Sequence, residues 1–331
     1  MTLLASIDED STSFQEIPVI DLAMISTEDP DSKKALADKV RAACVNVGFF
    51  YGARLPVTNH GISETIIQEA VDRSKDFFSL PLEDKMMASR IVQIENKKSP
   101  NFKGYSPLLS GNNDPDNDGD LQEGFEFGLE QIAQGQDDSS DEGVMAGANV
   151  WPSQLPEFRR AALQYYHAAV NLGKKLFPLF ALALDLPENF FEDKTRHSAA
   201  LMKMLHYPPQ TGPVDGRVLG IGAHTDWECF TILWQEPGIQ ALQVLNSNQE
   251  WIDAPPTPGN DLGMMFSSPT VHRAINRSGV RRYSIPLFFG TDYGVKLEPI
   301  PSCVSTERPM KYEVITAGEY VKAKLRATYG H

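Results

Sequence analysis

The chain has 331 residues, enough for one large domain or two closely packed ones. Apolar residues make up 41% and charged residues 22%, a mixture typical of globular proteins. The 44 acidic and 30 basic residues give a net charge of −14, which argues against nucleic acid or an anionic membrane surface as a partner. No apolar run reaches the ~20 residues of a membrane span, and three scattered cysteines form no disulfide or zinc pattern. We therefore expect a cytoplasmic protein, and nothing in the sequence indicates an obligate protein partner.

The N-terminal half mixes short apolar runs with amphipathic periodicity. Residues 1–15 are acidic and polar and are expected to form a disordered arm. Residues 95–150 are rich in Gly, Asn, Asp, Ser and Pro, which predicts long loops with one strand near 123–128. Ser63 is a plausible N-cap, and Pro178 predicts a bend or break in a long helix. The expected elements are strands at 17–22 and 49–51 and helices over 32–48, 63–78 and 156–184.

After about residue 200 the pattern changes to short apolar runs separated by Gly, Pro and Asn turns. This alternation is typical of an antiparallel β-sandwich or barrel. The runs are ALMKMLHY (200–207), CFTILW (229–234), ALQVL (241–245) and RYSIPLFF (282–289). A C-terminal helix begins with a Thr316/Glu319 capping box and ends at Gly330. The sequence therefore predicts an α+β fold in which helices pack against a β-barrel.

The stretch GIGAHTDWECFTILW (220–234) places two polar groups inside an apolar, β-branched run. His224 and Asp226 are two residues apart, so on a strand they point to the same face. A buried carboxylate is costly unless it is paired or bound to a metal. His272, in SSPTVHRAIN, offers a third ligand, and two histidines with one carboxylate form the facial triad of non-haem Fe(II) oxygenases. The alternative is that each of these side chains is an ordinary core or loop residue with a hydrogen-bond partner.

A second pair follows ten residues after His272. Arg282 and Ser284 share one face of a predicted strand, and a guanidinium beside a hydroxyl can clamp a carboxylate. Arg282 could instead be a surface or salt-bridged arginine, as its neighbour Arg281 is expected to be. The combined pattern of H-x-D, a distant His and R-x-S favours the metal site over separate structural roles.

The chain resembles the isopenicillin N synthase-like family of Fe(II)/2-oxoglutarate-dependent oxygenases. The motifs that carry the resemblance are IPVIDL, VGFFY, VTNHGI, FFSLPLEDK, KGYSPL, EGFEFG, LHYPPQ, GIGAHTDW, WIDAPPTPG, HRAINRSGVRRYSIPLFF and TAGEY. The resemblance implies a double-stranded β-helix (jelly roll) over 199–331 with its C-terminal helix, and a helical N-terminal oxygenase region over 16–198 packed around it. It also implies that His224, Asp226 and His272 hold iron, and that Arg282 and Ser284 bind the distal carboxylate of 2-oxoglutarate.

The resemblance further implies an activity. The enzyme would use Fe(2+), with 2-oxoglutarate and O₂ as co-substrates, to hydroxylate, desaturate or cyclise a small organic molecule in secondary metabolism. Tyr207 would lie near 2-oxoglutarate, or else be a core aromatic residue whose hydroxyl has a partner. Candidates for the substrate end, with core packing as the alternative, are Tyr105, Phe125, Phe127, Phe288 and His206. His60 in TNHG is interpreted as structural.

Two departures from the family pattern keep other functions open. The segment NDLGMMF (260–266) is shorter than usual by roughly a strand and its turn, on the order of 10 residues. A missing strand would expose ladder groups and could displace His272. The residues GARLP (52–56) interrupt what is normally a continuous GFFYVTNHGI. The alternatives are a 2-oxoglutarate-independent oxidase of the isopenicillin N synthase or aminocyclopropane-carboxylate oxidase type, and an inactive protein that retains the fold.

Overall fold

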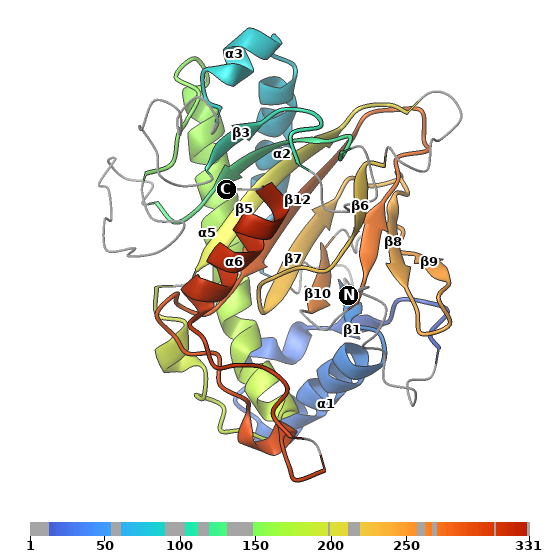
Figure 1. Ribbon diagram of the computed structural model, residues 1–331, viewed down its shortest axis with the longest axis vertical. Coiled ribbons are helices and arrows are strands. Elements are labelled where there is room, and N and C mark those ends of the chain that lie inside the picture. The colour runs from blue at the N-terminus through green and yellow to red at the C-terminus, as the bar shows by residue number, and fades with distance from the viewer. Residues whose placement is uncertain are drawn as a thin grey trace.

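Short runs rich in β-branched and aromatic residues form the strands, and amphipathic segments form the helices, in a computed structural model (Figure 1). The structure describes residues 13–53, 61–89, 103–111, 119–130, 148–197, 199–210, 219–256, 262–266, 270–307 and 309–329. The helices are α1 (Pro30–Asn46), α2 (Glu64–Phe78), α3 (Leu82–Met86), α5 (Pro156–Ala183) and α6 (Ala317–Tyr329), with 3-10 helices η2 (Ala23–Ser26), η3 (Glu192–Lys194) and η4 (Pro301–Cys303). None of these described helices is long and apolar enough to cross a membrane.

The described strands form two sheets. They are β1 (Val19–Asp21), β2 (Phe49–Ala53), β3 (Gly104–Ser106), β4 (Glu123–Phe127), β5 (Ala200–Tyr207), β6 (Ile221–His224), β7 (Phe230–Gln235), β8 (Leu242–Leu245), β9 (Trp251–Asp253), β10 (Leu262–Phe266), β11 (His272–Ala274) and β12 (Arg282–Phe289). The larger sheet has 8 strands in the order β1-β2-β10-β7-β12-β5-β4-β3, and the smaller has 4 in the order β6-β11-β8-β9. Phe49 and Leu233 of the large sheet pack with Leu242 and Val244 of the small sheet, which closes the jelly roll. The predicted α+β class and jelly-roll core are confirmed.

The two faces of the large sheet serve different purposes. Strand β12 pairs with β5 so that Arg282 lies opposite Tyr207 and Ser284 opposite Leu205. Because side chains alternate along a strand, these residues point between the two sheets. The intervening Tyr283 points to the other face and joins the large hydrophobic core. One strand therefore supplies both the core and the interior of the jelly roll.

Helix α5 covers the core face as one continuous helix, so of the bend or break predicted at Pro178 the break is wrong, and the bend stays a prediction. Proline removes one helical hydrogen bond and costs about 3 kcal/mol in a helix interior. The residues around it, Leu176, Phe177 and Leu179, are buried in the core, and this packing holds the helix on both sides of the proline. Helix α6 packs elsewhere, against Leu201, which lies on the face that points between the sheets.

The predicted helix ends are borne out in part. At the start of α6 the Thr316 amide donates to Glu319 Oε2 at 2.8 Å, and the Glu319 amide donates to Thr316 Oγ1 at 3.2 Å, which confirms the capping box. Ser63 occupies the N-cap position of α2, but its side chain accepts no cap hydrogen bond. Gly330 lies outside the described residues.

The shortened segment before His272 still contributes a strand. Strand β10 pairs with β7 on one side and with β2 on the other, so its ladder is occupied on both edges. At the second departure, Gly52 and Ala53 extend β2 and pair in parallel with β1. Residues 54–60, including His60, lie outside the described residues. A strand is therefore present in the segment where one was expected to be missing, and His272 lies on the paired strand β11.

The division into regions stays a prediction. Residues 1–12 of the expected arm lie outside the described residues, while Phe14 packs against the cluster that joins the sheets. The expected boundary between 198 and 199 immediately precedes β5, and strands from both sides of it share the large sheet.

The contact between α5 and β12 can be tested at Gly173. A Cβ atom there would lie 2.5 Å from Cδ2 of Phe289, so Gly173→Ala is expected to lower the free energy of unfolding by about 1–3 kcal/mol through overpacking. Gly294→Ala is the matched control, because nothing lies within 4 Å of its added Cβ. Urea denaturation measures both variants, and equal stability of the two would contradict this packing.

Candidate metal centre and substrate pocket

Two histidines and an aspartate meet at one end of the small sheet. His272 on β11 lies directly opposite His224 at the end of β6, with 4.2 Å between ring centroids. Asp226 lies just after β6 and not on it, which corrects the prediction of a shared strand, but its side chain still joins the two rings. Its Oδ1 is 3.9 Å from Nε2 of His224 and 3.8 Å from Nε2 of His272. These ligand atoms all lie within 4.8 Å of one another, so the three residues could hold one metal ion.

Hydrogen bonds prepare these side chains as ligands. Nδ1 of His224 donates to the Gly222 carbonyl at 2.7 Å, and Nδ1 of His272 faces the Thr270 carbonyl at 3.3 Å. Because a carbonyl can only accept, the proton lies on Nδ1 and the lone pair of Nε2 is free. Burial, helped by the neighbouring His224, lowers the pKa of His272 to about 4, which keeps that imidazole neutral.

The carboxylate of Asp226 is oriented in the same way. The Thr231 hydroxyl donates to Asp226 Oδ2, which leaves Oδ1 facing the histidines. All three candidate ligands therefore turn one lone pair that is free to coordinate toward a common point, as a shared metal requires.

A buried guanidinium lies on the large sheet, between the two sheets. Arg282 is 1% exposed, and its Nη2 donates to Gln235 Oε1 at 3.0 Å, while no described residue accepts a hydrogen bond from Nε or Nη1. The guanidinium carbon lies 5.0 Å from the centre of the Tyr207 ring, and Ser284 is buried two residues along the strand. A buried charge with unsatisfied donors is costly, so the arrangement fits a bound anion with oxygen acceptors.

A cavity adjoins the candidate metal ligands. His224 and Asp226 line it together with Glu126, Lys203, Glu228 and Phe288, and α6 covers it with Val321 and Leu325. Phe288 is thus the one residue of the predicted substrate end found in the wall of this cavity. The remaining candidates Tyr105, Phe125 and Phe127 belong to the hydrophobic core, as the alternative reading held. The alternation on β4 explains this, because Phe125 faces Phe158 of α5 whereas Glu126 faces the cavity.

Comparison with known families decides the assignment. Residues 17–154 match the family described as non-haem dioxygenase in morphine synthesis N-terminal, and residues 198–291 match the 2OG-Fe(II) oxygenase superfamily. Over 328 residues the chain is 34% identical to the 2-oxoglutarate-Fe(II) type oxidoreductase hxnY of Emericella nidulans, covering 95% of this chain and 90% of that protein. The chain belongs to the 2OG-Fe(II) oxygenase superfamily.

Solved structures agree on the fold of this oxygenase. A 2OG-Fe(II) oxygenase family protein from Caulobacter crescentus has 25% identity and a TM-score of 0.76, with 95% of this chain and 99% of that chain covered. A full-length protein of Neurospora crassa, solved in complex with alpha-KG and thymine, has a TM-score of 0.78 at 23% identity, with 97% and 98% covered.

The family settles the class of the enzyme. The predicted Fe(2+), 2-oxoglutarate and O₂ chemistry is confirmed, and the protein is an Fe(II)- and 2-oxoglutarate-dependent dioxygenase. A 2-oxoglutarate-independent oxidase and an inactive protein are the less favoured alternatives.

His206, a predicted pocket residue, lies in a polar cluster on the opposite face of the large sheet. Its Nδ1 is 2.7 Å from Glu123 Oε1, and Glu123 Oε2 accepts from Lys85 at 2.7 Å and from the Tyr105 hydroxyl at 2.5 Å. Burial acts to raise the pKa of Glu123, but these hydrogen bonds outweigh it and hold the pKa below its ordinary value. The cluster joins α3, β3, β4 and β5 behind the site, so the pocket expectation for His206 is wrong.

Sequence reasoning missed the polar side chains of the cavity. Lys203 Nζ pairs with Glu126 Oε1 at 2.8 Å across β5 and β4. Burial, with the charge of Asp226, raises the pKa of Glu228 to about 8. The available signal was a charged residue inside each of the apolar runs ALMKMLHY, EGFEFG and DWECF.

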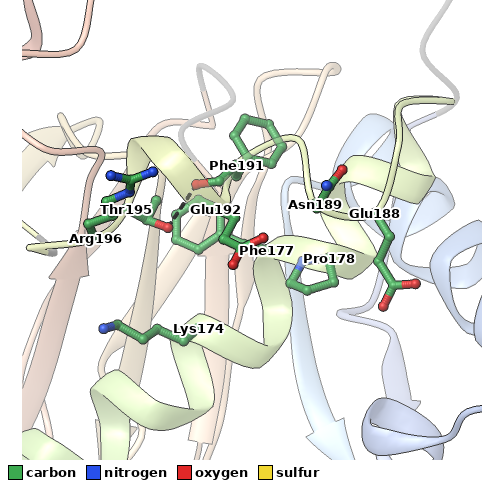
Figure 2. Close-up of a pocket in the computed structure, with 9 residues that line it drawn as sticks. All are labelled: Lys174, Phe177, Pro178, Glu188, Asn189, Phe191, Glu192, Thr195 and Arg196. Carbon is green, nitrogen blue, oxygen red and sulfur yellow. Dashed lines mark hydrogen bonds between the residues drawn. The ribbon is translucent and has the colours of Figure 1, made fainter.

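A larger hollow lies on the outer surface, between α5 and the segment around η3 (Figure 2). Figure 2 shows Lys174 and Arg196 toward one end and Glu188 at the other. Lys174, Glu188, Glu192 and Arg196 are exposed, and none of the candidate metal ligands lies there. The hollow is therefore separate from the candidate site.

The cluster around Glu123 gives a stability test. Lys85→Met would leave the Glu123 carboxylate buried without its cation, and we expect the free energy of unfolding to fall by about 3–5 kcal/mol. Lys75→Met is the control, since Lys75 pairs with Glu236 at the surface and such pairs contribute less than about 1 kcal/mol. Urea unfolding measures both; a loss for Lys85→Met no larger than for the control would contradict a structural role of the cluster.

Proposed function

We propose that this dioxygenase oxidises a small organic molecule in the cavity beside His224, Asp226 and His272, with these three residues as the iron ligands. The observation that carries the proposal is the buried Arg282, because no described residue accepts a hydrogen bond from its Nε or Nη1. The ring of Tyr207 beside it packs with Ile221 and Ala274, which lie on the two strands that carry the histidines. Arg282, Ser284 and Tyr207 would form the 2-oxoglutarate site.

The side chains of the proposed sites fit iron and 2-oxoglutarate by their chemistry. Imidazole nitrogens with one carboxylate form the donor set used for Fe(II) in oxygenases, and three ligands leave positions for a chelating 2-oxo acid and O₂. When bound, iron and 2-oxoglutarate supply O₂ activation coupled to decarboxylation of 2-oxoglutarate to succinate. The distal carboxylate of 2-oxoglutarate matches the unpartnered donors of Arg282 in charge and in hydrogen bonding.

The protein's own residues hold the guanidinium of Arg282 and the candidate iron ligands in fixed orientations. Gln235 fixes one end of the guanidinium through Nη2, so the remaining donors are held in place before the co-substrate arrives. Arginine stays protonated in proteins, even though burial lowers the pKa of Arg282. Thr231, Gly222 and Thr270 hold the iron ligands through the hydrogen bonds described above, which reduces the reorganisation needed for metal binding.

A small-molecule substrate is supported by the position and the walls of the cavity. Apolar side chains such as Phe288 and Leu205 can exclude water beside His224 and Asp226. The Neurospora crassa protein, which shares the fold, is found with thymine and alpha-KG. The net charge of −14 disfavours nucleic acid and membranes as partners, and three free cysteines support a cytoplasmic location.

The proposal is tested by anaerobic addition of Fe(II) and then 2-oxoglutarate to the purified protein. A saturable visible charge-transfer band, and succinate formed on admission of O₂, are the expected results. Iron binding without the band would favour an oxidase that does not use 2-oxoglutarate, and no iron binding would contradict the metal centre.

Removal of the proposed clamp gives a second prediction. Arg282→Ala is expected to weaken 2-oxoglutarate binding at least about 100-fold, because a charge-assisted pair in a buried site contributes several kcal/mol. Arg281→Ala is the matched control, since Arg281 is the preceding residue and is exposed. Titration of the charge-transfer band measures both, with circular dichroism as a check of folding; similar affinities in the two variants would refute the clamp.

Removal of the proposed carboxylate ligand gives a third prediction for this site. Asp226→Ala should abolish stoichiometric Fe(II) binding, because two imidazoles alone are a weak site for Fe(II). Asp253→Ala removes an exposed carboxylate from β9 and should bind iron normally. Anaerobic equilibrium dialysis with iron analysis gives the stoichiometry, and retention of one tightly bound iron by Asp226→Ala would exclude this ligand set.

A further inference from the structure

Gln122 places a buried amide in the wall of the cavity that contains His224 and Asp226. Its side chain lines this cavity and the residue is 7% exposed. No described residue donates a hydrogen bond to its Oε1. A buried amide oxygen without a donor is costly, so this side chain calls for a hydrogen-bond donor from a molecule that enters the cavity.

The chain just before Gln122 is fixed to the strand that carries His224. Oδ1 of the buried Asp120 accepts a hydrogen bond from the Gly222 amide of β6 at 2.9 Å. The carbonyl of the same Gly222 accepts from Nδ1 of His224 at 2.7 Å. A molecule bound to Gln122 would therefore lie in the same cavity as the candidate ligand His224, against a wall that is tied to the strand of that ligand.

Gln122 belongs to a polar row that carries no net charge. Glu126 lies four residues further along the chain and lines the same cavity, as the two-residue alternation of a strand requires. A Cβ atom added to Gly124, between them, would lie 2.7 Å from Cε of Lys203, so the stem of Lys203 crosses β4 at this glycine. The Lys203 ammonium lies 2.8 Å from Glu126 Oε1, and the two charges cancel. The polar row, which consists of Gln122 and the Lys203–Glu126 pair, therefore suits an uncharged polar group better than an ion.

The chemistry of the walls defines the kind of molecule that fits. The amide of Gln122 carries an acceptor and a donor side by side, and such an amide pairs through two hydrogen bonds with an edge that has a donor next to an acceptor. The N–H and C=O of a carboxamide or a lactam form such an edge. Apolar side chains that can hold the rest of the molecule also line the cavity: Leu201, Leu205, Ile221, Phe288, Val321 and Leu325.

We propose that the substrate of this enzyme carries an uncharged amide edge, an N–H beside a C=O as in a carboxamide or a lactam, and that Gln122 recognises it. The proposal rests on the proposed function and names its substrate class. The N–H of the substrate would donate to Oε1 of Gln122, and its apolar body would lie along side chains such as Leu205 and Phe288. Gln122 is thus a specificity-determining residue.

The test uses two uncharged probes of nearly equal size and shape, oxindole and 2-indanone. Both have a carbonyl group, but only oxindole has an N–H beside it. Calorimetric titration is run anaerobically on the full chain, with and without Fe(II) and 2-oxoglutarate, on the natural protein, Gln122→Met and Gln240→Met. Gln240→Met is the matched control, because Gln240 also has a buried Oε1 without a described donor but lies outside the cavity wall. Thermal unfolding of each variant checks that it is folded.

We expect oxindole to bind at least about ten times more tightly than 2-indanone, a difference of about 1.4 kcal/mol. The ratio should fall to about one in Gln122→Met, which has no hydrogen-bonding group at that position, and persist in Gln240→Met. Equal affinities in the natural protein, a ratio that survives in Gln122→Met, or no binding of either probe would each overturn the proposal. The charge-transfer band of the same samples reports separately on the proposed function, because the probe preference is also measured without metal.

Discussion

The two-residue alternation of β4, β5 and β12 is the constraint on which the rest of the structure depends. Each of these strands has a mainly apolar face toward α5, and the face between the two sheets carries polar side chains such as Glu126, Lys203 and Arg282. A register slip of one residue would bury Arg282 in the hydrophobic core and turn Tyr283 into the space between the two sheets. Core packing and the geometry of the candidate site are therefore not separable here, since one ladder of hydrogen bonds fixes both.

The small sheet supplies the two histidines of the candidate metal centre. It presents His224 and His272 from neighbouring strands, so the distance between the two rings is set by backbone pairing and not by flexible side chains. Asp226 then reaches the same point from the turn after β6, where Thr231 of the large sheet holds its second oxygen. A candidate site assembled from both sheets requires the jelly roll to be closed, so with the proposed ligand set the metal affinity would depend on the packing of Phe49, Leu233 and Val244 between the sheets.

Local chemistry explains how much of this could be predicted from the sequence. The H-x-D and R-x-S motifs can be recognised in the sequence because polar groups at positions i and i+2 interrupt apolar runs. The pocket aromatics could not be assigned, because the face on which Phe125 or Lys203 lies depends on strand register, and register is a tertiary property. The helix does not break at Pro178, since burial of its neighbours outweighs the lost hydrogen bond. The short segment before His272 looked like a missing strand, because pairing of β10 on both edges is visible only in three dimensions.

The buried carboxylate of Glu123 and the buried guanidinium of Arg282 show how the structure separates stability from function. Glu123 is satisfied by Lys85, Tyr105 and His206, so its charge is balanced within the chain and its role ends with the fold. Arg282 is buried as deeply, but no described residue accepts a hydrogen bond from its Nε or Nη1. Selection for stability alone would have replaced such an unsatisfied buried charge by an apolar residue, since that exchange is neutral or favourable. The free energy that Arg282 costs the empty protein is recovered only when an anion occupies the space beside it, and this is the condition under which a ligand-binding residue is retained.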